Sequence, residues 1–280
     1  MSMDWRALMT FAAVAIAIYL GIIAAMYTFQ RSLMYQPGKN LGSPMASGLP
    51  EMVAVNLKHP DQTKTVSWYK SASTNKPTLI YFQGNAGNIG DRRDKVRPFL
   101  DVGMGVMLVG YRGYGNNQGT PTEEGLYSDA TLALEFLSRT GIMPDHWILY
   151  GESLGSAVTV EVANRHAKSS PVAAVILEAP FSSMTEAAKS HYPWLPVSAI
   201  LKDKFESISK IKSINAPLMI IHGSSDNVVP ISLGKKLFNA AVAPKTKHWI
   251  DGASHNDVFE KGGSGFALEF IRNIWANRSG

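Results

Sequence analysis

The segment from Trp147 to Ala163 constrains the fold of this chain more than any other. It runs from an apolar stretch into the pentapeptide Gly-Glu-Ser-Leu-Gly at 151–155, and then into small and apolar residues typical of a helix. A G-x-S-x-G pentapeptide between a strand and a helix predicts a sharp turn that strains the backbone of its serine, here Ser153. We expect its glycines to keep the approach to Ser153 free of side chains. An ordinary strand-to-helix turn that happens to contain a serine would have the same sequence pattern, so the rest of the chain must decide between the two interpretations.

Length and composition allow one large domain and exclude several kinds of site. The 280 residues are 45% hydrophobic and 18% charged, enough for a full core. Because cysteine is absent, disulfides, thiolate catalysis and cysteine-ligated metals are excluded. The chain contains no P-loop, no G-x-G-x-x-G after a strand and no H-E-x-x-H, so we expect neither a cofactor nor a metal. A net charge of +5 without a basic tail fits anionic lipid at least as well as nucleic acid, and we expect no nucleic-acid partner.

Residues 1–35 differ from the rest of the chain. The 23 residues 7–29 carry no charge and are bounded by Arg6 and Arg31. At about 1.5 Å per residue, a helix of this length slightly exceeds a hydrocarbon core of about 30 Å. We therefore expect an uncleaved single-pass anchor that crosses the lipid bilayer, in a bacterial inner membrane. A buried core helix and a cleaved signal peptide are the alternatives, although the apolar run is longer than a typical signal core. The basic residues on its two sides are too evenly distributed to predict orientation.

After a linker at 36–50, rich in Pro, Gly and Ser, residues 51–280 predict a catalytic domain in which strands and helices alternate. Such alternation favours the α/β class, with a mainly parallel, eight-stranded sheet and helices on both faces. We expect strands at 51–58, 65–71, 78–83, 104–110, 145–150, 172–178, 217–223 and 246–250, and helices at 88–97, 121–139, 153–167, 231–241 and 264–276. The first two strands have no helix between them and predict an antiparallel edge.

Two local signals predict where helices begin and end. Thr120, Pro121 and Glu123 fit the N-cap, N1 and N3 positions of a capping box. Pro98 is expected to end or kink the helix before it.

Two further polar residues follow predicted strands, as functional residues of parallel sheets do. Asp226 lies just beyond the strand at 217–223, and His255 lies in the loop after the strand at 246–250. The order Ser153, Asp226, His255 is that of the triad in the α/β-hydrolase fold. In such a triad the imidazole takes the serine's proton and the carboxylate holds the imidazole in the required tautomer. Glu178, after another strand, is an alternative acid, and the other histidines are expected to be structural.

Acyl transfer also requires donors for the oxyanion. The expected donors are the backbone N–H groups of Leu154, directly after the serine, and of Asn85 in the loop Gln83–Asn88. A plain loop in which Asn88 caps the next helix fits the same residues.

Residues 181–215 predict a lid insert. Tyr192, Trp194 and Leu195 are the expected substrate-binding residues, and four lysines follow between 202 and 212. Apolar and basic residues together suit an acyl-chain cover close to anionic headgroups. An ordinary packed helical insert with solvated lysines is the alternative, and the short length predicts an open or modest pocket.

Six motifs together carry a family resemblance. They are QGNAGN at 83–88, YRGYG at 111–115, GESLG at 151–155, HYPWLP at 191–196, HGSSDNVVP at 222–230 and GASHND at 252–257. Across about residues 50–275, and in its N-terminal anchor, the chain resembles the membrane-anchored α/β-hydrolase-domain proteins related to the yeast bud-emergence suppressors.

This resemblance implies a serine hydrolase of acyl esters or thioesters, some relatives being depalmitoylases. It implies the same triad, Ser153, Asp226 and His255, and an oxyanion loop at 84–88. The chain departs from the family at Gln83, where histidine is usual, and Glu152 is a less usual neighbour of the serine. An acyl-protein thioesterase, a monoacylglycerol or lysophospholipid lipase, and a catalytically silent membrane scaffold therefore remain alternatives.

Overall fold

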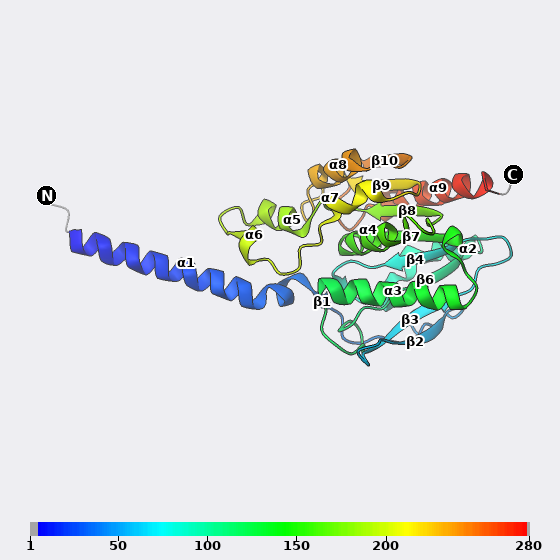
Figure 1. The fold of residues 1–280 in the computed structure, drawn as a ribbon, viewed down its shortest axis with the longest axis horizontal. Helices are drawn as coiled ribbons and strands as arrows, with labels where there is room; N and C mark the ends of the chain where they lie inside the picture. Colours follow the sequence, from blue (N-terminus) through cyan, green and yellow to red (C-terminus); the bar gives the residue numbers. More distant parts are fainter. Residues whose placement is uncertain (1–4, 279–280) are drawn as a thin grey trace.

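An eight-stranded sheet forms the centre of the structure, a computed structural model that describes residues 5–278 (Figure 1). The strand order is β10-β9-β8-β7-β4-β6-β3-β2. The strands are β2 (Val53–Lys58), β3 (Lys64–Lys70), β4 (Thr78–Phe82), β6 (Gly105–Leu108), β7 (Trp147–Glu152), β8 (Ala174–Glu178), β9 (Leu218–Gly223) and β10 (Lys245–Ile250). β3 pairs antiparallel with both β2 and β6, and all other pairs are parallel. The predicted mainly parallel sheet with an antiparallel edge is confirmed.

Helices cover both faces of the sheet, because alternate strand residues point to opposite faces. Trp147 and Leu149 of β7 belong to one core, and Ile148 and Tyr150 belong to the other. The first core includes residues of α3 (Glu123–Arg139), α4 (Leu154–His166) and α8 (Ile231–Ala240), and the second includes residues of α2 (Arg93–Asp101) and α9 (Ser264–Ala276). The strands between these layers are apolar on both sides, as buried parallel strands are.

Two predicted helix boundaries are wrong. Helix α3 is capped by Thr122, whose Oγ1 accepts a hydrogen bond from the N–H of Gly125, so Thr120 and Pro121 precede the helix. Pro98 lies inside α2 instead of ending it. The side chains of Phe99 and Leu100 are buried in the core just beyond it, and this packing outweighs the lost hydrogen bond.

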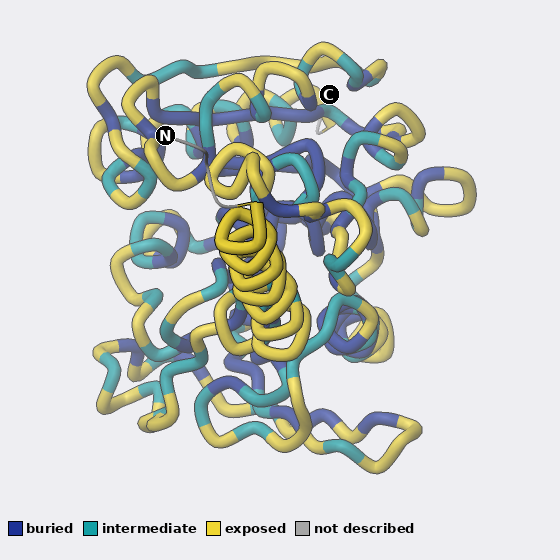
Figure 2. Tube along the Cα trace, turned by 90° about the vertical axis from the view of Figure 1, so that its left-hand side faces the viewer, coloured by how far each residue is buried: buried dark blue, intermediate teal, exposed yellow. Residues whose placement is uncertain are grey.

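Helix α1 (Trp5–Met34) extends away from the rest of the molecule (Figure 1). It is exposed along almost its whole length (Figure 2), and its most apolar stretch has a mean hydropathy of 2.4. Within residues 5–278 it is the one helix long and apolar enough to cross a membrane.

The segment after α1 lies against the domain. Strand β1 (Gln36–Pro37) pairs in parallel with β5 (Ala86–Gly87), and the side chain of Leu49 is completely buried. The stretch predicted as a linker therefore contacts the loop Gln83–Asn88 beside Ser153.

The segment 181–215 lies at the end of the domain from which α1 emerges (Figure 1). It contains three short helices, α5 (Met184–His191), α6 (Val197–Ile200) and α7 (Ser207–Lys210). The remaining short turns are η1 (Ile89–Arg92), η2 (Pro144–His146), η3 (Ile211–Ser213) and η4 (Phe259–Gly263).

Candidate active site

Ser153 occupies the turn between β7 and α4 with a strained backbone. Its φ of 50° and ψ of −115° are values that side-chain-bearing residues seldom adopt. The glycines around it serve packing: a Cβ on Gly155 would lie 2.0 Å from the carbonyl oxygen of Phe82, and one on Gly151 would lie 2.4 Å from that of Gly155. They let α4 lie directly against β4 and β7, whereas the sequence suggested that they clear the approach to the serine.

The structure brings Ser153, His255 and Asp226 together at the carboxyl edge of the sheet. His255 Nε2 lies 3.0 Å from Ser153 Oγ, and His255 Nδ1 lies 2.7 Å from Asp226 Oδ2. The other carboxylate oxygen of Asp226 accepts hydrogen bonds from the N–H groups of Val228 and Val229, at 2.9 and 2.7 Å. The three side chains thus form one continuous chain of hydrogen bonds.

Asp226 remains charged because of its hydrogen-bond donors. Burial disfavours the charged carboxylate, but hydrogen bonds from His222 and His255 outweigh it and hold the pKa of Asp226 well below its ordinary value. An ionised Asp226 favours the His255 tautomer whose Nε2 is free to accept the serine proton.

His222 contacts this site, although we expected only a structural role for it from the sequence. Its Nε2 lies 2.9 Å from the carbonyl oxygen of Val229 and 3.2 Å from Asp226 Oδ2, and its ring is completely buried. Gly234 makes room for it, since a Cβ there would lie 2.4 Å from His222 Nδ1. The one sequence feature that hints at a contact between His222 and Asp226 is their i, i+4 spacing around the end of β9.

Glu178, the alternative acid, belongs to a different network. Its carboxylate accepts hydrogen bonds from Tyr150, at 2.5 Å, and from Lys95, at 2.6 Å. Glu152, next to the serine, accepts a hydrogen bond from Tyr81. Burial disfavours its charge, but Lys95 and Arg92 outweigh this effect and lower the pKa of Glu152. The carboxylates of Glu178, which is buried, and of Glu152, which is partly exposed, are thereby paired with two cations, Lys95 and Arg92.

The two expected oxyanion donors lie beside Ser153. Leu154 is the first residue of α4, where an N–H has no acceptor within the helix. The Asn85 side chain donates to the carbonyl oxygen of Met34 at 2.9 Å, and its backbone carbonyl accepts from the N–H of Gln36 at 2.9 Å and from Tyr114 at 2.8 Å. The Asn85 N–H itself has no acceptor among residues 5–278. Both amides are therefore available to a ligand.

The rest of this loop includes Gln83, at which the chain departs from the family it resembles. Gln83 is completely buried, and neither its Oε1 nor its Nε2 has a partner within the described residues. A Cβ on Gly84 would lie 3.6 Å from Ser153 Cβ, an ordinary van der Waals contact, so a side chain here would border directly on the serine. Asn88 caps η1 through its Oδ1, which accepts from the N–H of Gly90 at 2.8 Å. The capping alternative for Asn88 is thus confirmed, and the Asn85 N–H remains without an acceptor in the described residues.

An apolar cavity of about 330 Å³ adjoins these groups. Ser153, Leu154 and Asn85 line it on one side. The other walls are Met26, Gln30, Leu33, Met34, Phe181, Met184, Ala187, Ala188, His191, Tyr192, Leu195, Val197, Ile200, Leu201, Val228 and Val229. Of the three residues expected to bind substrate, Tyr192 and Leu195 line the cavity, whereas Trp194 lies outside it with its ring 6.4 Å from that of Tyr19 on α1.

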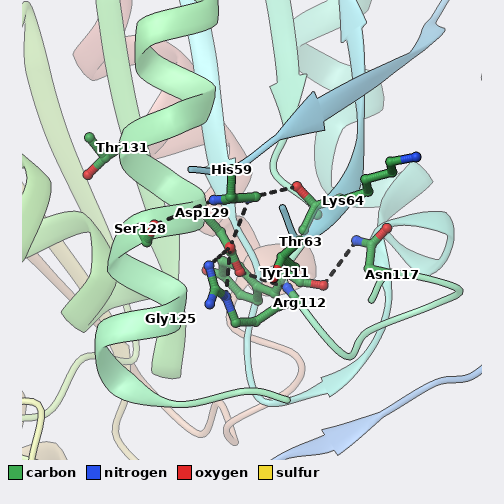
Figure 3. Close-up of polar contacts among 12 residues, drawn as sticks. His59, Thr63, Lys64, Tyr111, Arg112, Asn117, Gly125, Ser128, Asp129 and Thr131 are labelled. Carbon is green, nitrogen blue, oxygen red and sulfur yellow. Dashed lines mark hydrogen bonds and ion pairs between the residues drawn. The ribbon is translucent and has the colours of Figure 1, made fainter. Parts of the chain in front are cut away.

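A second polar cluster lies elsewhere in the molecule (Figure 3). The Asp129 carboxylate accepts hydrogen bonds from the backbone N–H of Arg112, at 2.7 Å, and from its Nε, at 2.9 Å. His59 Nε2 lies 3.2 Å from the same carboxylate, and the His59 and Asp129 side chains are almost completely buried. This cluster ties the YRGYG loop and the β2–β3 hairpin to α3, which is a structural role.

The chain is similar in sequence to known proteins. Residues 99–255 match the sequence model of the prolyl oligopeptidase family. An uncharacterised protein of Mycobacterium tuberculosis is 37% identical over 255 residues, which cover 90% of this chain and 89% of that protein. The zebrafish lysophosphatidylserine lipase ABHD12 is 34% identical over 202 residues, which cover 66% of this chain and 53% of the lipase.

A solved structure shows the same fold. The crystal structure of an alpha-beta hydrolase from Vibrio vulnificus superposes with a TM-score of 0.69 at 21% identity, covering 82% of this chain and 87% of that one. The predicted fold is confirmed.

Proposed function

Since this chain belongs to the α/β-hydrolase family, we propose that it is a membrane-anchored serine hydrolase that cleaves acyl esters through an acyl-enzyme. The observation that carries the proposal is the hydrogen-bonded chain Ser153–His255–Asp226 beside an apolar cavity. A nucleophile, its base and the orienting acid within hydrogen-bond reach are the arrangement that such catalysis requires.

The reaction would proceed in two halves. Ser153 Oγ attacks the ester carbonyl carbon while His255 Nε2 takes its proton, and Asp226 stabilises the resulting imidazolium. The N–H groups of Leu154 and Asn85 hold the oxyanion of the tetrahedral intermediate. His255 then returns the proton to the leaving alcohol, and a water molecule releases the acid by the same steps. Neither half requires a metal or an organic cofactor.

The substrate class follows from the cavity walls, which are mostly apolar side chains suited to an acyl chain. The relative named as a lysophosphatidylserine lipase supports an ester-linked single-chain lipid. A thioesterase of acylated proteins and a monoacylglycerol lipase are the other candidates. Rates on matched esters and thioesters of several chain lengths distinguish them.

We further propose that α1 is a retained anchor in a bacterial inner membrane, followed by a connecting segment at 36–50 and a catalytic domain at 51–280 with a lid at 181–215. The composition and length of α1 support the anchor. Its last turns also contribute to the cavity, so removing it as a signal peptide would remove part of a wall beside Ser153.

Replacing Ser153 by Ala tests the proposal. We expect hydrolysis of p-nitrophenyl butyrate to fall by on the order of 10⁶, the cost of losing a triad nucleophile, and Asp226→Asn to cost less, on the order of 10⁴. Labelling by a fluorophosphonate should disappear in the Ser153→Ala variant. Near-normal turnover by this variant would contradict the assignment, and a wild-type protein that neither reacts with the probe nor hydrolyses any ester would support a silent scaffold.

A further inference from the structure

The membrane helix takes part in the cavity that holds Ser153. Met26, Gln30, Leu33 and Met34, all near the end of α1, line the same cavity as the serine. A helix that served as a tether alone would not need to contact the active site. The cavity wall on this side exists only while α1 is in place.

Polar contacts fix α1 against the lid segment. Gln30 is buried; its Nε2 donates to the carbonyl oxygen of Ile200 at 3.0 Å, and its Oε1 accepts from the N–H of Lys202 at 2.7 Å. The next residue adds a second contact: Arg31 donates two hydrogen bonds to the carboxylate of Asp203, at 2.7 and 3.0 Å. A buried amide satisfied on both sides and a two-bonded ion pair define a specific orientation of α1.

The lid segment also follows α1 along its apolar part. The hydroxyl of Tyr19 donates to the carbonyl oxygen of Trp194 at 2.8 Å. Tyr19 precedes Arg31 by twelve residues, about 18 Å along a helix. If α1 spans a bilayer with Arg31 near the headgroups, Trp194 lies at the depth of the acyl chains.

The exposed surface of this segment agrees with that depth. The side chains of Tyr192 and Trp194 are 44% and 53% exposed, and Val228 at the cavity wall is 54% exposed. The neighbouring Lys202 ammonium lies 4.1 Å from the ring centre of Tyr27, close to the charged end of α1. Aromatic residues toward the apolar part and basic residues toward its end are the order expected across a membrane interface.

From these contacts we propose that the cavity opens into the bilayer between α1 and the lid segment, and that α1 forms one wall of the acyl-chain site. The substrate is then a single-chain acyl ester already resident in the membrane, whose chain slides sideways to Ser153 without crossing water. This inference rests on the proposed ester hydrolysis. It adds the route by which the acyl chain enters the cavity and the role of α1 as one wall of the acyl-chain site.

A bulky substitution on α1 tests the wall. Leu33→Trp fills the cavity from the α1 side, and Leu20→Trp is the matched control because Leu20 is exposed on the same helix and does not line the cavity. The full-length protein in phosphatidylcholine vesicles is assayed with p-nitrophenyl palmitate and p-nitrophenyl butyrate. Each methylene group displaced from the site should lower kcat/KM about fourfold, so we expect Leu33→Trp to reduce the palmitate-to-butyrate ratio more than about tenfold. Leu20→Trp should leave the ratio unchanged.

Equal ratios in the two variants would overturn the inference. They would leave the proposed function standing as long as wild-type butyrate hydrolysis depends on Ser153. If butyrate hydrolysis does not depend on Ser153, the result contradicts the proposed function itself.

The absence of native cysteine permits an independent test of depth. A single cysteine at Trp194→Cys carries an environment-sensitive fluorophore, and the control is Val242→Cys, at an exposed residue in the loop after α8. In vesicles with nitroxide-labelled acyl chains, quenching at position 194 and none at 242 is the expected result. An absence of quenching at position 194 would place the lid segment in water and refute the sideways route.

Discussion

The hydrogen bonds around Asp226 give the protein a specific response to acid. The unfolded chain takes up a proton on this carboxylate at about pH 4, whereas the lowered pKa of the folded state delays uptake. The stabilisation by Asp226 is therefore complete above about pH 4 and is lost as the pH falls further, toward the folded pKa. We expect the melting temperature of the wild type to fall more steeply below about pH 4 than that of Asp226→Asn. Thermal unfolding in detergent across this range measures both slopes, and parallel curves would refute the assignment.

The limits of sequence-based prediction are visible in individual residues. Ser153, Asp226 and His255 could be predicted to converge, because their positions follow from which loops succeed parallel strands. The contact of His222 with Asp226 was not predicted, since the i, i+4 spacing of the two residues becomes a contact only where the chain folds back after β9. Trp194 was expected to bind substrate because the segment 181–215 is rich in apolar and basic residues. The direction of a side chain in such a segment depends on what the segment packs against, and Trp194 packs against Tyr19.

Among the elements, the contact between α4 and β4 depends on the absence of one side chain. A Cβ on Gly155 would lie 2.0 Å from the carbonyl oxygen of Phe82, and backbone atoms cannot give way as flexible side chains do. We expect Gly155→Ala to destabilise the fold by about 1–3 kcal/mol or more, the usual cost of overpacking. Gly265→Ala in α9 is the control, because a Cβ there meets nothing within 4 Å and alanine favours helices. Thermal unfolding compares the two, and equal melting temperatures would contradict the packing argument.

Element types were predictable where periodicity and length were clear, as in the alternating strands and helices after residue 78. The ends of helices were less predictable from the sequence. In sequence Thr120 fits a capping box better, because Pro121 and Glu123 follow at N1 and N3, but the structure selects Thr122, after the YRGYG loop that Asp129 holds through Arg112. Tertiary contacts of this kind have no signature within a short window of sequence.

At the scale of the whole molecule, α1 lines part of the cavity and is also long and apolar enough to cross a membrane. Nine of residues 7–29 are Leu, Ile, Val or Phe, and at roughly −0.3 to −0.6 kcal/mol each they favour insertion by a few kcal/mol. Cleavage at the end of α1, beyond Arg31, would also remove the contacts of Gln30 and Arg31 with the lid.

We therefore expect α1 to be retained in the mature protein. Alkaline washing of membranes should leave the protein in the pellet, and detergent should release it, because the anchor is held by apolar burial and not by charge. Intact-mass measurement of the released protein should give a mass that includes residues 5–34. A mass that lacks α1 would identify it as a signal peptide and would require the cavity to function with one wall open, which would separate catalysis by Ser153 from any role of the helix in binding the acyl chain.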